Sequence, residues 1–214
     1  MKRFEIITEA DARVLPIGET VGLARGGHVT PLARDTLKER RVTLVEEGRV
    51  TVDEALLAPP ADIRTVAIAS DHTGIALRRS LVAFLRARGL AVNDLGTDTP
   101  EAVDYPDMAA AVGREVARGE ADAGIVIDGA GIGSAIAANK VPGVRAAMCT
   151  SELLARYSRE HDGANVMTLG ATLVTNDEAR AIVTAWLGSA MHEARHIRRL
   201  AKIRALEQDR LSGA

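Results

Sequence analysis

Residues 124–140 read GIVIDGAGIGSAIAANK and predict a strand, a glycine-rich turn and a helix in direct succession. The apolar run 125–127 is bounded by small residues, as a buried parallel strand usually is, and Asp128 ends it. Three glycines then alternate with apolar residues ahead of a segment of helical composition: Gly129, Gly131 and Gly133.

Such a unit can bring backbone N–H groups and a helix N-terminus close to an anion or a developing oxyanion. The alternative is a tight turn whose glycines only permit close packing. The spacing matches neither G-x-G-x-x-G nor a Walker loop, so the motif alone leaves both interpretations open.

The composition is typical of a globular protein, except that it contains very few aromatic residues for the core. The 214 residues are 47% apolar but only 2% aromatic, so the core must be built from Ala, Val, Leu and Ile. The net charge of -2 with mixed signs gives no field that attracts nucleic acid or an anionic membrane, and neither is expected as a partner.

Cysteine usage and hydropathy predict a reduced, cytoplasmic protein. The single cysteine, Cys149, excludes an internal disulfide and a cysteine-based zinc site. No apolar run approaches the roughly 20 residues of a membrane span. The first residues, MKRFEIITEADARVLP, lack the apolar stretch of a secretory signal.

Strands and helices alternate regularly after Thr65. The predicted strands are 65–69, 91–95, 123–127, 144–149 and 165–169, and the helices between and after them are 75–88, 107–118, 151–159 and 177–187. This order predicts an α/β fold with a parallel, doubly wound sheet. Ligands of such sheets bind beyond the carboxyl ends of the strands, where Asp71, His72 and Asp128 are found.

The chain divides into an N-terminal extension (1–60), an α/β domain (61–190) and a basic C-terminal helix (191–214). In the extension, Thr8 is expected to cap one short helix and Pro31 to begin another. A short amphipathic segment at 51–57 and a linker at 58–61 follow. Because the extension holds few apolar residues, we expect it to need support from the main domain.

The basic C-terminal helix allows two interpretations. It is either a helix with a solvated face or an arm that delivers cations to an anionic ligand in a neighbouring subunit.

Several stretches together resemble the ribose-5-phosphate isomerase B and galactose-6-phosphate isomerase family, in order and spacing, from about Thr65 to Gln208. They are residues 70–74, 103–106, 129–140, 141–147 and 159–166, with Arg195, His196 and Arg199. The resemblance implies a Rossmann-like, three-layer α/β/α domain with a five-stranded parallel sheet. It also implies a homodimer or dimer of dimers with sites at the subunit interface, and no metal or organic cofactor.

The family interconverts phosphorylated aldoses and ketoses by moving a proton between C1 and C2 through an enediolate. That chemistry needs a base, an oxyanion stabiliser and a phosphate clamp. By resemblance, His161 opens the sugar ring and the amides of Gly129, Gly131 and Gly133 face the enediolate. The remaining substrate-binding positions are Asp71, His72, Tyr105, Ala130, Ser134, Asp162, Arg195 and Arg199. Considered alone, His72 or His161 would more often be a buried, hydrogen-bonded histidine, and Tyr105 could simply pack under a loop.

The chain departs from the family pattern at several positions where the family has catalytic or phosphate-binding residues. Asp128 stands where the family has a catalytic cysteine, and Ala130 replaces the neighbouring hydroxyl residue. Ser134 stands where one branch of the family has a glutamate. Asp162 replaces an asparagine and Thr172 replaces a phosphate-binding arginine.

Two hypotheses follow from these departures. In the first, Asp128 replaces the cysteine as the base, and the substrate is shifted from the family norm. In the second, the fold is kept without catalysis, the protein binds a sugar phosphate within a metabolic assembly, and Asp128 only caps the following helix. Cys149 is expected to be a small core residue in both cases.

The extension resembles, over residues 7–11 and 29–35, short N-terminal modules of enzymes associated with bacterial microcompartments. This resemblance implies that the extension recruits the enzyme to a shell or to co-packaged enzymes. The alternative is an arm that extends the contact between subunits.

Overall fold

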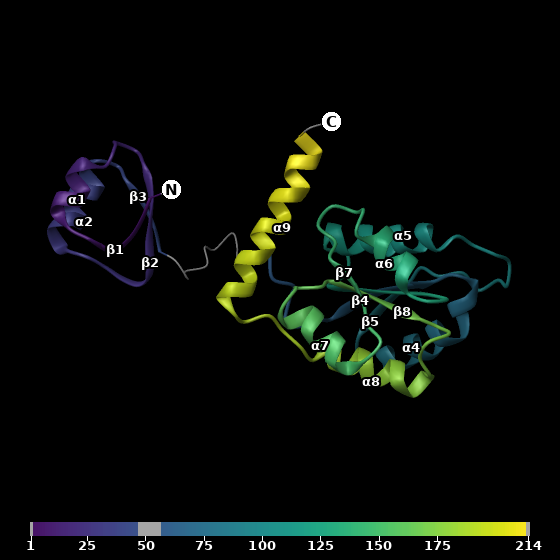
Figure 1. Ribbon diagram of the computed structural model, residues 1–214. Coiled ribbons are helices and arrows are strands. Elements are labelled where there is room, and N and C mark those ends of the chain that lie inside the picture. The colour runs from purple at the N-terminus through teal and green to yellow at the C-terminus, as the bar shows by residue number, and fades with distance from the viewer. Residues whose placement is uncertain (1, 47–56, 213–214) are drawn as a thin grey trace. The chain divides into compact units, whose positions relative to one another are not determined.

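The computed structural model describes residues 2–46 and 57–212, which fall into two compact units, Met1–Thr51 and Val52–Ala214 (Figure 1). The predicted amphipathic segment lies almost entirely outside the described residues. Residues 57–60, predicted to belong to the extension, lie in the larger unit. No helix in the described ranges is both long and apolar enough to cross a membrane.

The N-terminal unit is a small α/β module. Its elements are β1 (Arg3–Ile7), α1 (Glu9–Val14), β2 (Thr20–Val29), α2 (Pro31–Glu39) and β3 (Thr43–Glu46), and the strands form a parallel sheet in the order β1-β2-β3. Both predicted helix starts are confirmed. Thr8 caps α1 in a capping box with Asp11, and Pro31 occupies the first turn of α2.

The module has a hydrophobic core of its own, which the sequence analysis did not predict. Its buried residues come from every element except β3: Ile7, Ala12, Leu15, Val21, Leu23, Val29, Ala33 and Leu37. Strands β1 and β2 were missed because they mix charged or glycine residues with apolar ones, and β3 was missed because it is only four residues long. This core counts against the reason given for expecting the extension to need support from the main domain, and that need itself stays a prediction.

The larger unit confirms the predicted α/β fold. Its strands are β4 (Thr65–Ser70), β5 (Ala91–Asp94), β6 (Ala123–Asp128), β7 (Ala146–Met148) and β8 (Val166–Gly170). All pairings are parallel and the order is β5-β4-β6-β8-β7. The order reverses between β4 and β6, so the ligand-binding crevice of a doubly wound sheet is expected at the carboxyl ends of these two strands.

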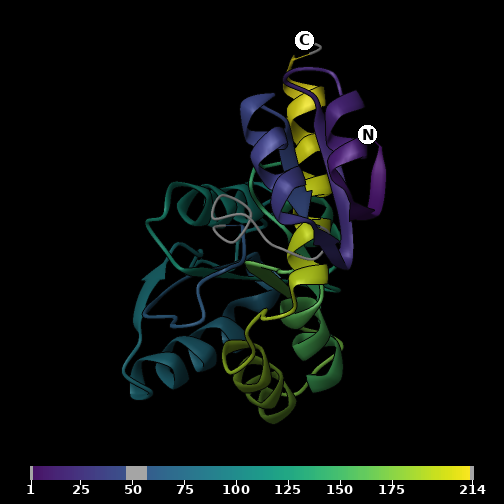
Figure 2. The same cartoon turned by 90° about the vertical axis from the view of Figure 1, so that its left-hand side faces the viewer.

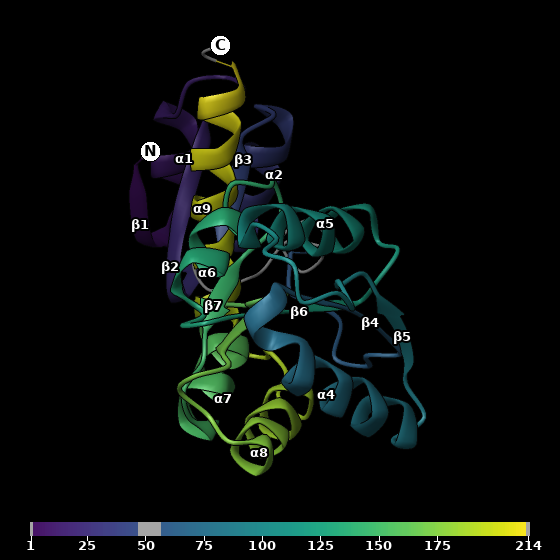
Figure 3. The ribbon, with the colours of Figure 1, turned by 90° about the vertical axis from the view of Figure 1, so that its right-hand side faces the viewer.

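Helices cover both faces of this sheet (Figure 2; Figure 3). One face packs against α4 (Ile75–Ala87), α7 (Glu152–Glu160) and α8 (Asn176–Leu187), and the other against α5 (Tyr105–Arg118) and α6 (Ile132–Ala138). A short 3-10 helix, η1 (His72–Gly74), follows β4, and α9 (Ala194–Ser212) ends the described chain.

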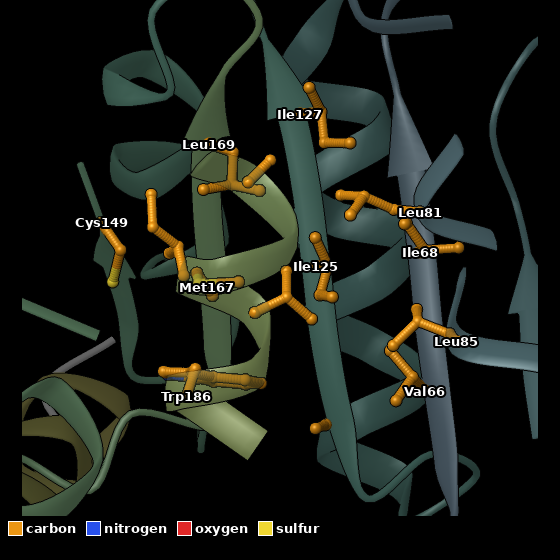
Figure 4. Packing of buried hydrophobic residues seen from close by; sticks show 14 of the residues in the cluster. Val66, Ile68, Leu81, Leu85, Ile125, Ile127, Cys149, Met167, Leu169 and Trp186 are labelled. Carbon is orange, nitrogen blue, oxygen red and sulfur yellow. The ribbon is translucent and has the colours of Figure 1, made fainter. Parts of the chain in front are cut away.

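Aliphatic side chains from the sheet and from α4 and α8 form the larger core (Figure 4). The single tryptophan, Trp186, lies in it fully buried, and its indole N–H donates to the hydroxyl of Ser158 at 3.2 Å. Cys149 is also fully buried there, which confirms its prediction as a core residue. Burial raises the pKa of its thiol from 9.0 to about 11, so the thiol is protonated at neutral pH.

Two arginines bind residues 57–60 to the rest of the larger unit. Nη2 of Arg145 donates to the carbonyl of Leu57 at 3.0 Å, and Nη2 of Arg159 donates to the carbonyl of Pro60 at 2.8 Å. Arg159 is fully buried, bonds two further carbonyls and lies over the ring of Trp186. Burial lowers the pKa of both arginines, that of Arg159 to about 10.

Candidate active site

Asp128 is the last residue of β6, and only 4% of its surface is exposed. Its Oδ1 accepts hydrogen bonds from the N–H groups of Ala130, at 2.9 Å, and of Gly131. Its Oδ2 accepts from the N–H of Ser134 at 2.9 Å and from the Ser134 hydroxyl at 2.5 Å. The carboxylate therefore closes the glycine turn and caps the first turn of α6.

This arrangement argues against the predicted role of Asp128 as the base. A carboxylate has about four lone-pair positions, and the turn occupies all of them. A base must present a free lone pair to the C–H bond of its substrate. The geometry instead matches the alternative left open by the sequence, in which Asp128 caps the following helix.

Two further site predictions change for the same reason. The amide of Gly131 donates to Asp128, which leaves it no hydrogen for a ligand. Ser134 is fully buried, and its amide and hydroxyl both donate to Asp128, so neither donor is free for a substrate. Both residues support the turn.

Other amides of the turn remain available. Within the part of the chain that the structure describes, the N–H groups of Gly129 and Gly133 have no acceptor. The carbonyl of Gly129 accepts from the amide of Thr172 at 3.1 Å and from its hydroxyl at 2.6 Å. Thr172, which stands in place of the family's arginine, therefore braces the turn. The prediction that Gly129 and Gly133 offer amides to an oxyanion is compatible with this geometry.

Asp71 lies at the neighbouring strand end and opens η1. Its Oδ1 accepts from the N–H of Thr73 at 2.9 Å, from the Thr73 hydroxyl at 2.6 Å and from the N–H of Gly74 at 3.3 Å. The next residue, His72, is exposed. Thr73 was not selected from the sequence, although a threonine two residues after an aspartate is a common signal of such a turn.

Tyr105 covers the far side of the glycine turn. A Cβ built on Gly133 would lie 2.6 Å from two ring carbons of Tyr105, so the ring rests directly on this glycine. The tyrosine remains 40% exposed. The structure thus brings Asp71, His72, Tyr105 and the glycine turn together at the carboxyl end of the sheet.

The remaining predicted site residues form a second cluster. His161 ends α7, and its ring is stacked between those of Tyr157 and His196 with ring centres 4.6 Å apart in both pairs. Nη1 of Arg199 lies 3.3 Å from Nδ1 of His196, so Nδ1 accepts and the proton is on Nε2. Nε2 is buried without a partner among the described residues.

This second cluster borders a cavity of about 380 Å³ whose lining includes His161, His192, Arg195 and His196. Arg195 pairs with Glu193 at 3.1 Å, and Asp162 is exposed beside the cluster. His196 lay inside a matched stretch of the sequence but had been given no role. The described residues hold no group of three or more His, Cys, Asp or Glu side chains that could bind a metal ion.

The two clusters lie at opposite ends of the sheet. Asp71 and Asp128 are at the carboxyl ends of β4 and β6. Helix α7 starts beyond the carboxyl end of β7 and returns to the amino end of β8, so His161 lies at the amino ends of the strands. One chain therefore does not assemble the predicted site.

Helices α6 and α7 also carry large apolar side chains that the described chain leaves uncovered. Ile132 and Ile136 on α6 are 55% and 59% exposed. On α7, Leu153, Leu154 and Tyr157 are each between 46% and 49% exposed. An uncovered apolar surface of this kind is typical of a subunit interface.

Comparisons with known proteins agree with this geometry. The family model described as Ribose/Galactose Isomerase matches residues 66–203. Ribose-5-phosphate isomerase B of Escherichia coli is 43% identical over 148 residues, which cover 69% of this chain and 99% of that protein. A putative sugar phosphate isomerase of Bacillus subtilis is 38% identical over 147 residues, covering 68% and 99%.

Solved structures give the same result. Ribose-5-phosphate isomerase B of Clostridium thermocellum is similar with a TM-score of 0.67 and 48% identity, over 68% of this chain and 98% of that chain. The Mycoplasma genitalium enzyme, solved with bound ribulose-5-phosphate, is similar with a TM-score of 0.65 and 41% identity, over 67% and 96%. The residues matched by the family model lie in the larger unit.

Proposed function

Because this chain belongs to the ribose/galactose isomerase family, we propose that it interconverts a phosphorylated aldose and the corresponding ketose through an enediolate. The observation that supports this most is the arrangement at the carboxyl end of the sheet. Two amides are unpaired within the described residues: that of Gly129, which lies next to Thr73 of the Asp71 turn, and that of Gly133, which lies against the ring of Tyr105. Fixed amides of this kind stabilise an oxyanion as it develops.

A second copy of the chain supplies the rest of the site. Residues His161, Asp162, Arg195 and Arg199 of one copy would reach the carboxyl-end cluster of the other, where the arginines bind the phosphate. Two observations support this: the clusters are separated within one chain, and α6 and α7 expose apolar side chains. The proposed assembly is a homodimer or a dimer of dimers.

The substrate is proposed to be a four- to six-carbon sugar phosphate, with ribose 5-phosphate as the reference because similar proteins carry its name. Thr172 cannot hold phosphate as an arginine does, since it is uncharged and its hydroxyl is bonded to Gly129. Asp162 adds a negative charge beside the second cluster, which contains the arginines predicted to bind the phosphate. Both changes favour a substrate that differs from the reference sugar.

One observation favours a second function. The four hydrogen bonds that Asp128 accepts from its own turn count against Asp128 as a substitute for the family's catalytic cysteine. Such a site, in which Asp128 has no free lone pair, suits a protein that binds the sugar phosphate without converting it. This protein would act as part of a metabolic assembly.

We also propose that the N-terminal unit recruits the protein to such an assembly in the cytoplasm, for example a microcompartment shell. Its separate core supports an independent role, and it exposes Ile6, Val14, Ile17 and Leu32. The competing role is a contact between subunits. Removing residues 1–51 should abolish co-localisation with shells while leaving the oligomer intact, whereas dissociation into monomers would support the competing role.

The test of the main proposal is a screen of purified protein in D2O with four- to six-carbon sugar phosphates, followed by proton NMR. Isomerisation is expected for at least one sugar, with deuterium incorporated at C1 or C2. Binding by calorimetry without conversion or exchange would contradict the isomerase proposal and support the binding function.

A further inference from the structure

Two aspartates stand at adjacent strand ends beside the topological switch of the sheet. Ser70 of β4 is in register with Ile127 of β6, and the amide of Asp71 donates to the carbonyl of Ile127 at 3.1 Å. Asp71 and Asp128 are therefore neighbours across the crevice in which a ligand is expected. They differ sharply in how their carboxylates are used.

The difference lies in the second oxygen. Asp128 accepts two hydrogen bonds on each oxygen, all from residues of its own turn. Asp71 accepts three on Oδ1, and no hydrogen bond to its Oδ2 occurs within the described residues. Asp71 therefore combines a fixed position with a free lone pair, which Asp128 lacks.

The free oxygen is accessible even though the residue is only 6% exposed. Within the described chain, the side-chain atoms that are both shielded from solvent and unpaired are Glu19 Oε2 and His196 Nε2. Since Asp71 Oδ2 is unpaired and is not one of these two atoms, it is not completely shielded from solvent.

The Asp71 turn also faces the glycine turn. A Cβ built on Gly129 would lie 3.9 Å from the hydroxyl oxygen of Thr73, the residue that bonds Asp71. Gly129 and Thr73 are therefore in ordinary van der Waals range of each other, and the Thr73 hydroxyl in turn donates to Asp71. Oxyanion donor and candidate base occupy adjoining turns.

We propose that Asp71 is the base that carries the proton between C1 and C2, an assignment that rests on the proposed isomerase function. Oδ2 takes the proton from C2 of the aldose, and the electrons of the broken C–H bond form the double bond of the enediolate. The negative charge on O1 is stabilised by the amides of Gly129 and Gly133. A proton on the O2 hydroxyl moves to O1, and the electrons left on O2 form the C2=O double bond. The electrons of the C1=C2 bond then take the proton from the Asp71 carboxyl onto C1, and the ketose is formed.

The test compares Asp71→Asn, Asp71→Glu and Asp128→Asn with the wild type in D2O, using NMR for exchange and calorimetry for sugar-phosphate binding. We expect Asp71→Asn to bind the sugar but to lose turnover and exchange by about 10²–10⁴-fold, the usual contribution of a general base. Asp71→Glu should recover part of the exchange because it restores a carboxylate. Asp128→Asn should keep measurable exchange.

The outcomes separate the two proposals. Exchange by Asp71→Asn at the wild-type rate would show that Asp71 is not the base, while the isomerase function would stand. Loss of exchange in Asp128→Asn alone, with folding intact by circular dichroism, would also overturn the assignment. A wild type without turnover or exchange on any sugar phosphate would overturn the isomerase function itself, and the assignment with it.

Discussion

Ser134 donates two hydrogen bonds to a single oxygen of Asp128, one from its amide at 2.9 Å and one from its hydroxyl at 2.5 Å. Both side chains are buried, so the pair fixes the glycine turn from inside the protein. The residue predicted to stand in the position of the family's catalytic cysteine thus organises the turn, and the proposed chemistry is assigned to the residues around it.

This role predicts a large stability effect at Asp128. Asn in place of Asp128 cannot accept the same four hydrogen bonds, and buried donors would lose their acceptor. We expect Asp128→Asn to lower the free energy of unfolding by about 3 kcal/mol, measured by urea denaturation. The matched control is Asp162→Asn, at an exposed site, which should change it by less than about 0.5 kcal/mol. Equal effects of the two changes would contradict the role of Asp128 as a cap.

The contact between Gly133 and Tyr105 predicts a change in substrate affinity. Because a Cβ on Gly133 would lie 2.6 Å from the tyrosine ring, Gly133→Ala must push the ring away. The ring is partly exposed and can move, so we expect stability within about 1 kcal/mol of wild type and a rise in KM of roughly tenfold. Tyr105→Ala should produce a similar rise without the steric conflict. An unchanged KM in both variants would show that Tyr105 does not contact the substrate.

The buried His196 predicts a loss of stability in mild acid. Burial, and then the charges of His161, Arg195 and Arg199, lower the pKa of His196 below its ordinary value of 6.5, while Glu193 acts in the opposite direction. The unfolded chain therefore binds the proton more readily than the folded chain. The stabilisation is complete above about pH 6.5 and is lost as the pH falls through the lower, folded pKa.

Urea unfolding between pH 8 and pH 5 checks this expectation. His196→Phe keeps a ring in the stack but cannot titrate, so its unfolding midpoint should fall less on acidification than that of the wild type. His192→Gln, at an exposed position beside the same cavity, should keep the wild-type dependence. Parallel pH curves for the wild type and His196→Phe would assign the acid sensitivity to other groups.

The hydrogen bonds to Leu57 and Pro60 predict how far the N-terminus of the larger unit can be shortened without loss of stability. A protein that starts at Ala61 lacks the carbonyls of Leu57 and Pro60, so Arg145 and Arg159 each lose an acceptor. We expect this protein to be less stable than one that starts at Val52 by at most about 1–3 kcal/mol for each of these part-buried donors left unpaired. Thermal unfolding of the two proteins measures the difference. Identical melting temperatures would show that the linker contacts contribute nothing.

Most of the larger unit could be predicted from the sequence because its strands are apolar runs between clear helical patterns. The strand predicted over 123–127 and the helix predicted over 151–159 illustrate this, since both depend on local sequence and are found over Ala123–Asp128 and Glu152–Glu160. The N-terminal strands were missed because β1 and β2 mix charged, glycine and apolar residues, so neither shows a clear alternation.

The site was predicted less completely, for a different reason. The sequence placed Asp71 and Asp128 at strand ends, but which lone pairs remain free depends on how each turn folds back on its own carboxylate. Only coordinates show that Ser134 and Gly131 satisfy Asp128 while Asp71 keeps one oxygen open. The stack of His161 on His196 likewise joins residues far apart in the sequence.

The central claim is that Asp71 of one copy and His161 of another complete one isomerase site. The direct measurement is the activity of Asp71→Asn and His161→Asn, assayed separately and after the two are unfolded and refolded together. If the site is shared, half of the refolded dimers are mixed and each holds one intact site, so activity should return to about a quarter of the wild-type value. Refolded mixtures as inactive as the separate variants, with an active wild type, would contradict the claim.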